Sequence, residues 1–243
     1  MAITLVGVGA QDANASASAF TITGAWPAGY TAVAGDVAIV IATGRPFTAG
    51  NYPATPLPAT YTSIANVSLS AGGGSTKDIT ISVWLKVLTA GESAPSISEG
   101  SSYQFGLTIQ TAVFRGVNTS TPQDATAVTS SGAAAATWTP TGLTTATPGA
   151  WVLSCVASSD DNALGLNSGS EQGFAVRMGD ASYDTIVGQD MAMGLATKEI
   201  SSLGAVICPT WRQTVNGNDV WVGITMALRP ASPFLGFWGT KWK

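Results

Sequence analysis

The sequence predicts an all-β protein, an antiparallel two-sheet β-sandwich of the jelly-roll type. Apolar and polar residues alternate with a period of two over most of the chain, which is the pattern of strands with one buried face. Glycine, proline, asparagine and aspartate cluster between these runs, as turns between strands require. No helical periodicity is sustained for long, so we expect sheets alone.

The expected strands are the alternating or β-branched runs between turn signals. They are Ile3–Val8, Ala19–Thr23, Val37–Ala42, Tyr61–Leu69, Ile79–Val87, Tyr103–Arg115, Trp151–Ser158, Gly173–Arg177, Ala205–Cys208, Cys208–Thr214 and Val220–Leu228. The clearest turn is Asn216-Gly217, because both residues accept positive φ at little steric cost. Between Asp184 and Lys198 two glycines interrupt a weak helical pattern, so we expect a strand or an irregular loop there.

Two of these runs predict which face is buried. One aliphatic stripe comprises Ile79, Ile81, Val83, Leu85 and Val87, and a second comprises Val220, Val222, Ile224, Met226 and Leu228. Trp84 and Trp221 alternate with these stripes and should point to the opposite faces. Both stripes are expected in one core between two sheets.

The run Ser131–Ala136 consists of small residues and is compatible with a linker between domains or with a turn inside one domain. We interpret it as a turn between two strands of one sandwich. Residues 1–231 are therefore expected to form a single domain, followed by an extension of residues 232–243.

Four short stretches pair a strand with a particular turn and follow one another along the chain. They are Ala34–Val40, Leu85–Glu92, Ala112–Asn118 with Thr121–Asp124, and Met226–Ala231. Their order resembles a β-sandwich module of minor structural proteins of tailed bacteriophages, especially tail-tip and fibre-associated proteins, over roughly residues 16 to 231. The resemblance implies a non-enzymatic virion protein, assembled in the host cytoplasm, that forms a surface-exposed tail-tip, fibre or head-appendage module. Its implied partners are other virion proteins and copies of itself.

The last twelve residues are rich in aromatic side chains, namely Phe234, Phe237, Trp238 and Trp242. The extension either folds back on its own sandwich or docks on another chain. We favour docking, with these four residues as anchors, because buried aromatic side chains dominate the energetics of interfaces.

The charge and hydropathy of the chain indicate which classes of partner it does not bind. The net charge is −4 and the 10 basic residues are scattered, which argues against a nucleic-acid surface. No run reaches the roughly 18 apolar residues of a membrane span, and the first residues lack the features of a signal peptide. We expect neither nucleic-acid binding nor membrane insertion.

The chain contains no histidine, so Ser-His-Asp and Cys-His catalysis are not available to it. The carboxylates that could act in pairs lie almost all in polar turns: Glu92, Glu99, Asp160, Asp161, Glu171, Asp180, Asp184 and Asp190. We predict no catalytic residue, no metal and no cofactor. The weak alternative is a Ca²⁺ site formed by Asp160-Asp161-Asn162 with Asp180 or Asp184, which supply hard oxygen ligands.

Cys155 and Cys208 fall in separate apolar strands and could meet in a core. A disulfide and a pair of buried free thiols are both open, and we favour free thiols because a cytoplasmic assembly route keeps cysteine reduced.

The eight tryptophans raise an alternative function, a host-surface or glycan-binding adhesion module. Trp84 and Trp221 are the candidates for stacking on a sugar, because they lie on the faces opposite the aliphatic stripes. Burial in the sandwich or in a subunit contact is the competing interpretation.

Overall fold

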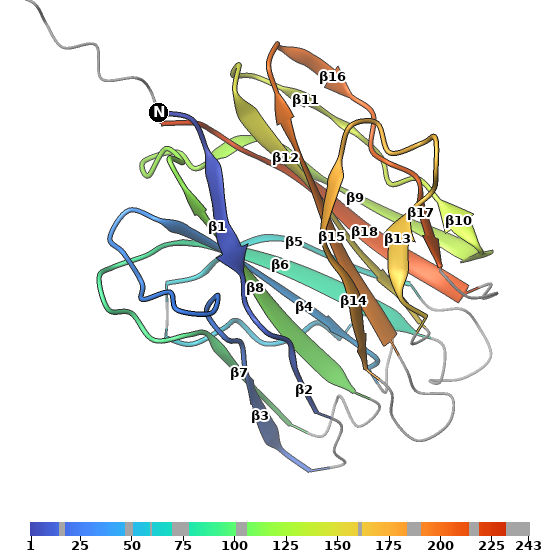
Figure 1. Ribbon diagram of the computed structural model, residues 1–243. Coiled ribbons are helices and arrows are strands. Elements are labelled where there is room, and N and C mark those ends of the chain that lie inside the picture. The colour runs from blue at the N-terminus through green and yellow to red at the C-terminus, as the bar shows by residue number, and fades with distance from the viewer. Residues whose placement is uncertain are drawn as a thin grey trace, which may run out of the picture.

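A computed structural model describes residues 1–14, 18–46, 51–58, 60–69, 78–100, 106–159, 162–183, 191–213 and 219–231, with the backbone alone for residues 180–183. Every regular element in these ranges is a β-strand, and every pairing is antiparallel, so the all-β prediction is confirmed (Figure 1). Over the same ranges, no helix has the length and hydropathy needed to cross a membrane.

Two large sheets dominate the fold (Figure 1). The first has the order β1-β8-β4-β6-β5, with β2 also paired to β8; its strands are β1 Thr4–Val8, β2 Asp12–Asn14, β4 Val37–Gly44, β5 Thr62–Leu69, β6 Ile79–Val87 and β8 Leu107–Arg115. The second has the order β14-β15-β12-β18-β9; its strands are β9 Gln123–Ala135, β12 Ala150–Ser158, β14 Ala175–Tyr183, β15 Met191–Ile200 and β18 Asp219–Leu228. Each sheet is thus formed by one half of the chain.

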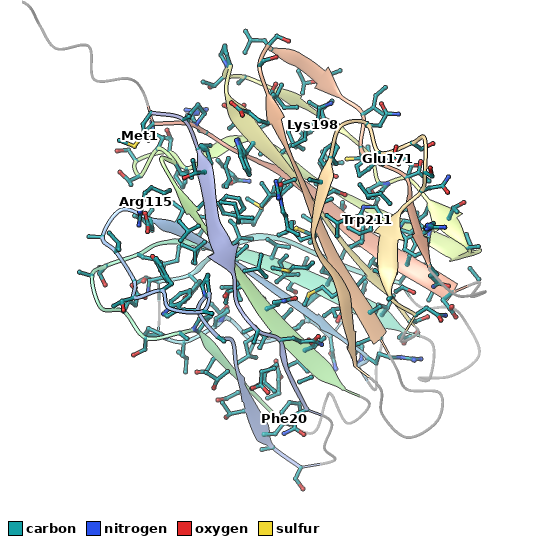
Figure 2. All side chains as sticks on the ribbon, viewed as in Figure 1. Met1, Phe20, Arg115, Glu171, Lys198 and Trp211 are labelled. Carbon is teal, nitrogen blue, oxygen red and sulfur yellow. The ribbon has the colours of Figure 1, made fainter. Side chains whose placement is uncertain are left out.

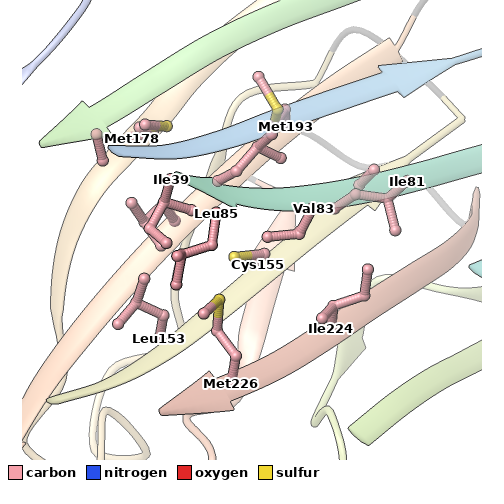
Figure 3. Packing of buried hydrophobic residues seen from close by; sticks show 14 of the residues in the cluster. Ile39, Ile81, Val83, Leu85, Leu153, Cys155, Met178, Met193, Ile224 and Met226 are labelled. Atoms are coloured by element: carbon pink, nitrogen blue, oxygen red, sulfur yellow. The ribbon is translucent and has the colours of Figure 1, made fainter. Parts of the chain in front are cut away.

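The two sheets pack face to face around one apolar core (Figure 3). Ile39, Ile81 and Leu85 of the first sheet meet Leu153 and Ile224 of the second, and each of them is almost fully buried. Both predicted aliphatic stripes contribute to this cluster, in agreement with the sequence. This arrangement is that of a β-sandwich.

Small sheets cover the outer faces of the sandwich. β3 Phe20–Thr23 pairs with β7 Ser96–Glu99, and their side chains pack over the outer face of the first sheet. The second sheet is covered by β10 Thr137–Trp138, β17 Trp211–Gln213 and β13 Leu164–Leu166, while β11 Leu143–Thr145 pairs with β16 Gly204–Val206. The central strands are consequently buried on both faces, so Thr80, Ser82 and Ser154 are buried as well.

The structure corrects one local prediction and completes another. Ser131–Ala136 is not a turn, because β9 continues through it to Ala135. Between Asp184 and Lys198 the part from Met191 onward is the strand β15, which confirms one of the two predicted outcomes. The predicted turn at Asn216-Gly217 lies outside the described residues.

Candidate functional site

The turns of all four motifs singled out from the sequence lie at one end of the sandwich. β4 begins beside the ends of β6 and β8, because Val37 lies opposite Val87 and Phe114. The ends of β8 and β18 also lie side by side, because Val117 forms an isolated antiparallel bridge with Pro230. Met1 lies at the same end, where its amino group donates a hydrogen bond to the carbonyl oxygen of Ala231 (Figure 2).

Asp36 organises the first part of this end. Its carboxylate accepts hydrogen bonds of 2.8 Å from Nε and from Nη2 of Arg115, and one of 2.9 Å from the hydroxyl of Tyr30. The carboxylate raises the pKa of Arg115, chiefly through these hydrogen bonds. Burial is the main reason that the pKa of Tyr30 is also raised. The Asp36 side chain is almost fully buried whereas that of Arg115 is half exposed, so the pair fixes a turn at the surface.

A second cluster lies at the end of β6. Lys86 forms an ion pair with Glu92, and its ammonium lies 4.9 Å from the ring centroid of Tyr61. Burial alone would raise the pKa of Glu92, but hydrogen bonds from Lys86 and Thr89 outweigh it, so the pKa lies below its ordinary value. The pKa of Tyr61 is raised by burial and by the nearby charge of Glu92. These contacts close the Ala90–Glu92 turn onto the sheet.

The third cluster joins the start of β9 to the residues that follow β11 and β18. The Asp124 carboxylate accepts hydrogen bonds from the amides of Ala146 and Thr147, at 2.7 and 3.2 Å, and faces the guanidinium of Arg229. Arg229 also donates its own amide to the carbonyl oxygen of Pro122. These three ion pairs therefore all lie at the same end of the sandwich, which we call the ion-paired end.

Comparison with known proteins adds nothing to this picture, because no family model, no curated protein and no solved structure matches the chain.

Two tryptophans predicted as glycan contacts lie where the sequence placed them, on the outer faces, but both faces are covered. Trp84 is 2% exposed and packs with Ile22 and Ile97 beneath β3 and β7. Trp221 is 8% exposed and stacks on Trp138 at a centroid distance of 5.7 Å. Sugar stacking at Trp84 and Trp221 is not supported, because the small sheets occupy the ring faces that a sugar would need.

The structure describes only some of the other residues that were predicted as sites. Phe234, Phe237, Trp238 and Trp242 lie outside the described residues, as do Asp160, Asp161, Asp184 and Asp190. Across the ranges that the structure describes, no three cysteine, aspartate or glutamate side chains gather as a metal site would require. Glu92 acts in the ion pair with Lys86, and Glu99 accepts a hydrogen bond from the amide of Ala54.

The two cysteines are free and buried, as favoured from the sequence. Cys155 belongs to the core between the sheets, opposite Ile224. Cys208 contacts the hydroxyl of Thr225 at 3.2 Å, and Thr225 follows Ile224 in β18 and so points to the other face. The two thiols therefore lie on opposite sides of the second sheet and cannot form a disulfide in this fold.

Three hollows mark the described surface. The first, of about 300 Å³, lies beside Leu203; the second, of about 290 Å³, lies beside Lys86; and the third, of about 450 Å³, lies between Ile64 and the start of β9. None of the three has an aromatic side chain among the described residues that line it. The sequence predicts the motifs of the ion-paired end but not their pairing, because Asp36 and Arg115 are far apart in the chain.

Proposed function

We propose that this protein is a non-enzymatic structural protein of a tailed-phage virion that forms a surface-exposed tail-tip, fibre or head-appendage module. The observation that carries the proposal is the meeting of all four family-like motifs at the ion-paired end. Motifs that are separate in the sequence are connected there by hydrogen bonds into one surface, as an assembly contact would require. The proposed partners are other virion proteins and copies of the chain, and the proposed location is the virion.

The path of the chain at this end supports a docking role for the extension. Ala231 is the last described residue, and its amide donates a hydrogen bond of 2.7 Å to the carbonyl oxygen of Gly116. Residues 232–243 therefore start from a fixed point at the ion-paired end. We propose that Phe234, Phe237, Trp238 and Trp242 bind a neighbouring virion protein from that point, as a separate unit from the sandwich of residues 1–231.

The edge strand β9 offers a second place for assembly. It is 13 residues long and, among the described strands, pairs only with β18. From Ala125 to Ala135 it contains no charged residue and no proline, which are the devices that usually protect an edge from another chain. An open edge of this kind favours addition of a strand from a neighbour.

The jelly-roll type is the finer part of the fold prediction and remains a prediction. A jelly roll is built from two Greek keys arranged as a double sheet. Here the strands from β1 to β8 that form a large sheet all belong to the first, and those from β9 to β18 all belong to the second. This strand order favours a sandwich of two fused units over the jelly-roll type.

The test of the proposal is incorporation into particles. A chain that ends at Ala231 should stay folded, with a thermal midpoint within about 4 °C of the full chain, because a loss of about 1 kcal/mol shifts the midpoint by that much. It should fail to enter particles when it replaces the full chain during phage growth. As a matched control, Val176→Ala removes an exposed apolar side chain on β14, the edge of the second sheet opposite β9, and should leave incorporation intact. Normal incorporation of the shortened chain, or its unfolding, would contradict the docking role.

The alternative function, a glycan-binding adhesion module, is supported by a single observation. Tyr52, at 40% exposure, is the aromatic residue most open to solvent among the exposed large apolar residues. A glycan array with the full chain tests the alternative directly. Binding that is lost in Tyr52→Ala would favour adhesion over a purely structural role.

A further inference from the structure

We infer that the two halves of this chain are structural repeats related by an approximate two-fold axis, and that the inner face of each sheet fits a second copy of the same unit. The inference concerns a surface inside the monomer and stands independently of the proposed function. It rests on strand order, on register and on irregularities that recur at matching positions.

The strand order is the same in both halves. In the first sheet the chain order β1, β4, β5, β6, β8 gives the spatial order β1-β8-β4-β6-β5. In the second, the chain order β9, β12, β14, β15, β18 gives β9-β18-β12-β15-β14. Each strand of one series takes the place of its counterpart in the other. The covering pair β3–β7 likewise corresponds to β10–β17, with Ile22 opposite Ile97 in one and Trp138 opposite Trp211 in the other.

The register is the same as well. Ile39 lies opposite Leu85 and Ala112, at the place where Leu153 lies opposite Thr197 and Met226. The separation in sequence between Ile39 and Leu153 equals that between Ala112 and Met226. The central strands of the two halves therefore match residue by residue, without a shift.

Two β-bulges recur at matching positions. The register shifts between Leu5 and Gly7, opposite Phe114 and Val113, and it shifts again between Gln123 and Ala125, opposite the counterparts Leu228 and Ala227. A second shift, between Ser63 and Ala65, lies opposite Trp84 and Val83, and its counterpart between Val176 and Met178 lies opposite Ala196 and Leu195. Bulges are specific local features. Among the described residues, both shifts of the first sheet thus have a counterpart in the second, which is not expected of unrelated sheets; the second sheet has three further shifts without a counterpart.

Single residues outside the ladders repeat the same contacts. Gly35 and Gly149 both have positive φ, 88° and 79°, and their amides donate to the carbonyl oxygens of Leu88 and Ile200 at the ends of β6 and β15. The hydroxyl of Thr111 donates to the carbonyl oxygen of Ala25, and that of its counterpart Thr225 donates to the carbonyl oxygen of Thr141.

The packing between the halves has the symmetry of a dimer. β6 packs on β12, and their counterparts β15 and β4 pack on each other. The segment that follows β8 pairs antiparallel with the segment that follows β18 through the bridge of Val117 with Pro230. A surface that meets its own counterpart is the property of a two-fold interface. The axis therefore passes between the ends of β8 and β18.

The residue types have diverged although the geometry has not. Ile79, Ile81 and Val83 of the first core face correspond to Met191, Met193 and Leu195 of the second. Stiff β-branched side chains on one face thus meet flexible side chains on the other, which allows a closely packed core without identical residues.

A circular permutant tests the repeat on the whole sandwich. The two-fold axis relates Val117 to Ala231 and Gln123 to Leu5. Five residues connect Val117 to Gln123, whereas only Met1–Thr4 precede Leu5, so one residue inserted between Ala231 and Met1 should give a connection of the same length. The permutant runs from Ser120 to Ala231, through one glycine, and from Met1 to Thr119, and its control is the unpermuted chain 1–231. We expect a monomer with the same circular dichroism and a midpoint within about 4 °C of the control. A permutant that does not fold would overturn the equivalence of the two connections.

A cut chain tests the interface separately. A protease site inserted between Thr119 and Ser120, which are both exposed, divides the full chain at the axis. After cleavage, unfolding and refolding, native mass spectrometry should show the 1:1 complex of the halves together with homodimers of each half. A 1:1 complex without homodimers would overturn the inference that each face fits its own copy. Halves that stay apart would overturn the two-fold interface itself.

Discussion

Asp124 and Arg229 connect the first residues of β9 to the end of β18, with the carboxylate Oδ1 3.5 Å from the guanidinium Nε. The Asp124 side chain is fully buried, and its other oxygen accepts the amides of Ala146 and Thr147. One side chain therefore fixes three segments of the second half at the end of the sandwich from which the extension starts.

Replacement of Asp124 should be more harmful when it removes the hydrogen-bond acceptors than when it removes only the charge. Asp124→Ala leaves two amides without their acceptor and the Arg229 guanidinium without its ion-pair partner, and it should lower the free energy of unfolding by about 1 to 3 kcal/mol. Asp124→Asn keeps one oxygen and should lower it less. Urea unfolding of both variants measures the difference. Equal losses would contradict a role for the two amide contacts.

The pH dependence of stability should differ in sign between two carboxyl groups. The pKa of Glu92 is lower in the folded state than its ordinary value. Glu92 therefore stabilises the folded protein above about pH 4.3, the ordinary pKa of glutamate, and this stabilisation is lost as the pH falls. The pKa of Glu99 is raised by burial despite the amide of Ala54, so its contribution is lost as the pH rises instead. Thermal midpoints measured between about pH 3 and pH 7 should fall less steeply on acidification in Glu92→Gln than in the unchanged chain.

Glu99→Gln is the matched control for this experiment and should make the loss of stability on acidification steeper, not shallower. The same slope in the two variants would contradict the assignment.

The two core stripes should be equally sensitive to truncation. Ile81 and Ile224 are both fully buried between the sheets, so Ile81→Ala and Ile224→Ala should each lower the free energy of unfolding by about 2 to 5 kcal/mol. The exposed side chain of Val176 gives the control, since Val176→Ala removes little buried surface. A loss below about 0.5 kcal/mol at both core positions would mean that the stripes do not meet.

Neither cysteine should react with thiol reagents while the protein is folded. Burial raises the pKa of Cys155 and also that of Cys208, so little thiolate is present and access to it is closed. Mass spectrometry under non-reducing conditions should show two free thiols that are modified only after unfolding. Rapid modification of the native protein, or a loss of two hydrogens, would show that the second sheet opens.

Alternation of side chains was enough to predict most of the central strands. The stripes of β6 and β18 are β-branched or aliphatic at every second position, so their inner faces could be read directly. β9 was missed because it is an edge strand of alanine, serine and threonine whose two faces are both partly exposed. The covering strands β3 and β17 fall within the predicted strands Ala19–Thr23 and Cys208–Thr214. Their partners β7 and β10 were not predicted, because they are only four and two residues long, so the pairing over Trp84 and Trp221 was missed.

The repeat and the ion-paired end could not be found from sequence for a different reason. Both depend on partners far apart in the chain whose residue types carry no shared signature. Gly116 and its counterpart Pro230 have the same place in the fold but opposite backbone properties. Asp36 and Arg115 each lie beside a turn, and only the pairing of β4 with β8 brings them together.

The separation of the sheets along the chain also determines how the protein emerges from the ribosome. Every strand of the first large sheet has been synthesised by Arg115, before β9 begins at Gln123. The nascent first half can therefore pair its strands while its apolar inner face still lacks the second sheet. Since domains fold as they are made and exposed apolar surface promotes aggregation, this interval is the most vulnerable stage in the life of the chain. A pause in translation after residue 120 would prolong it, and a chaperone that binds aliphatic surface would act there first.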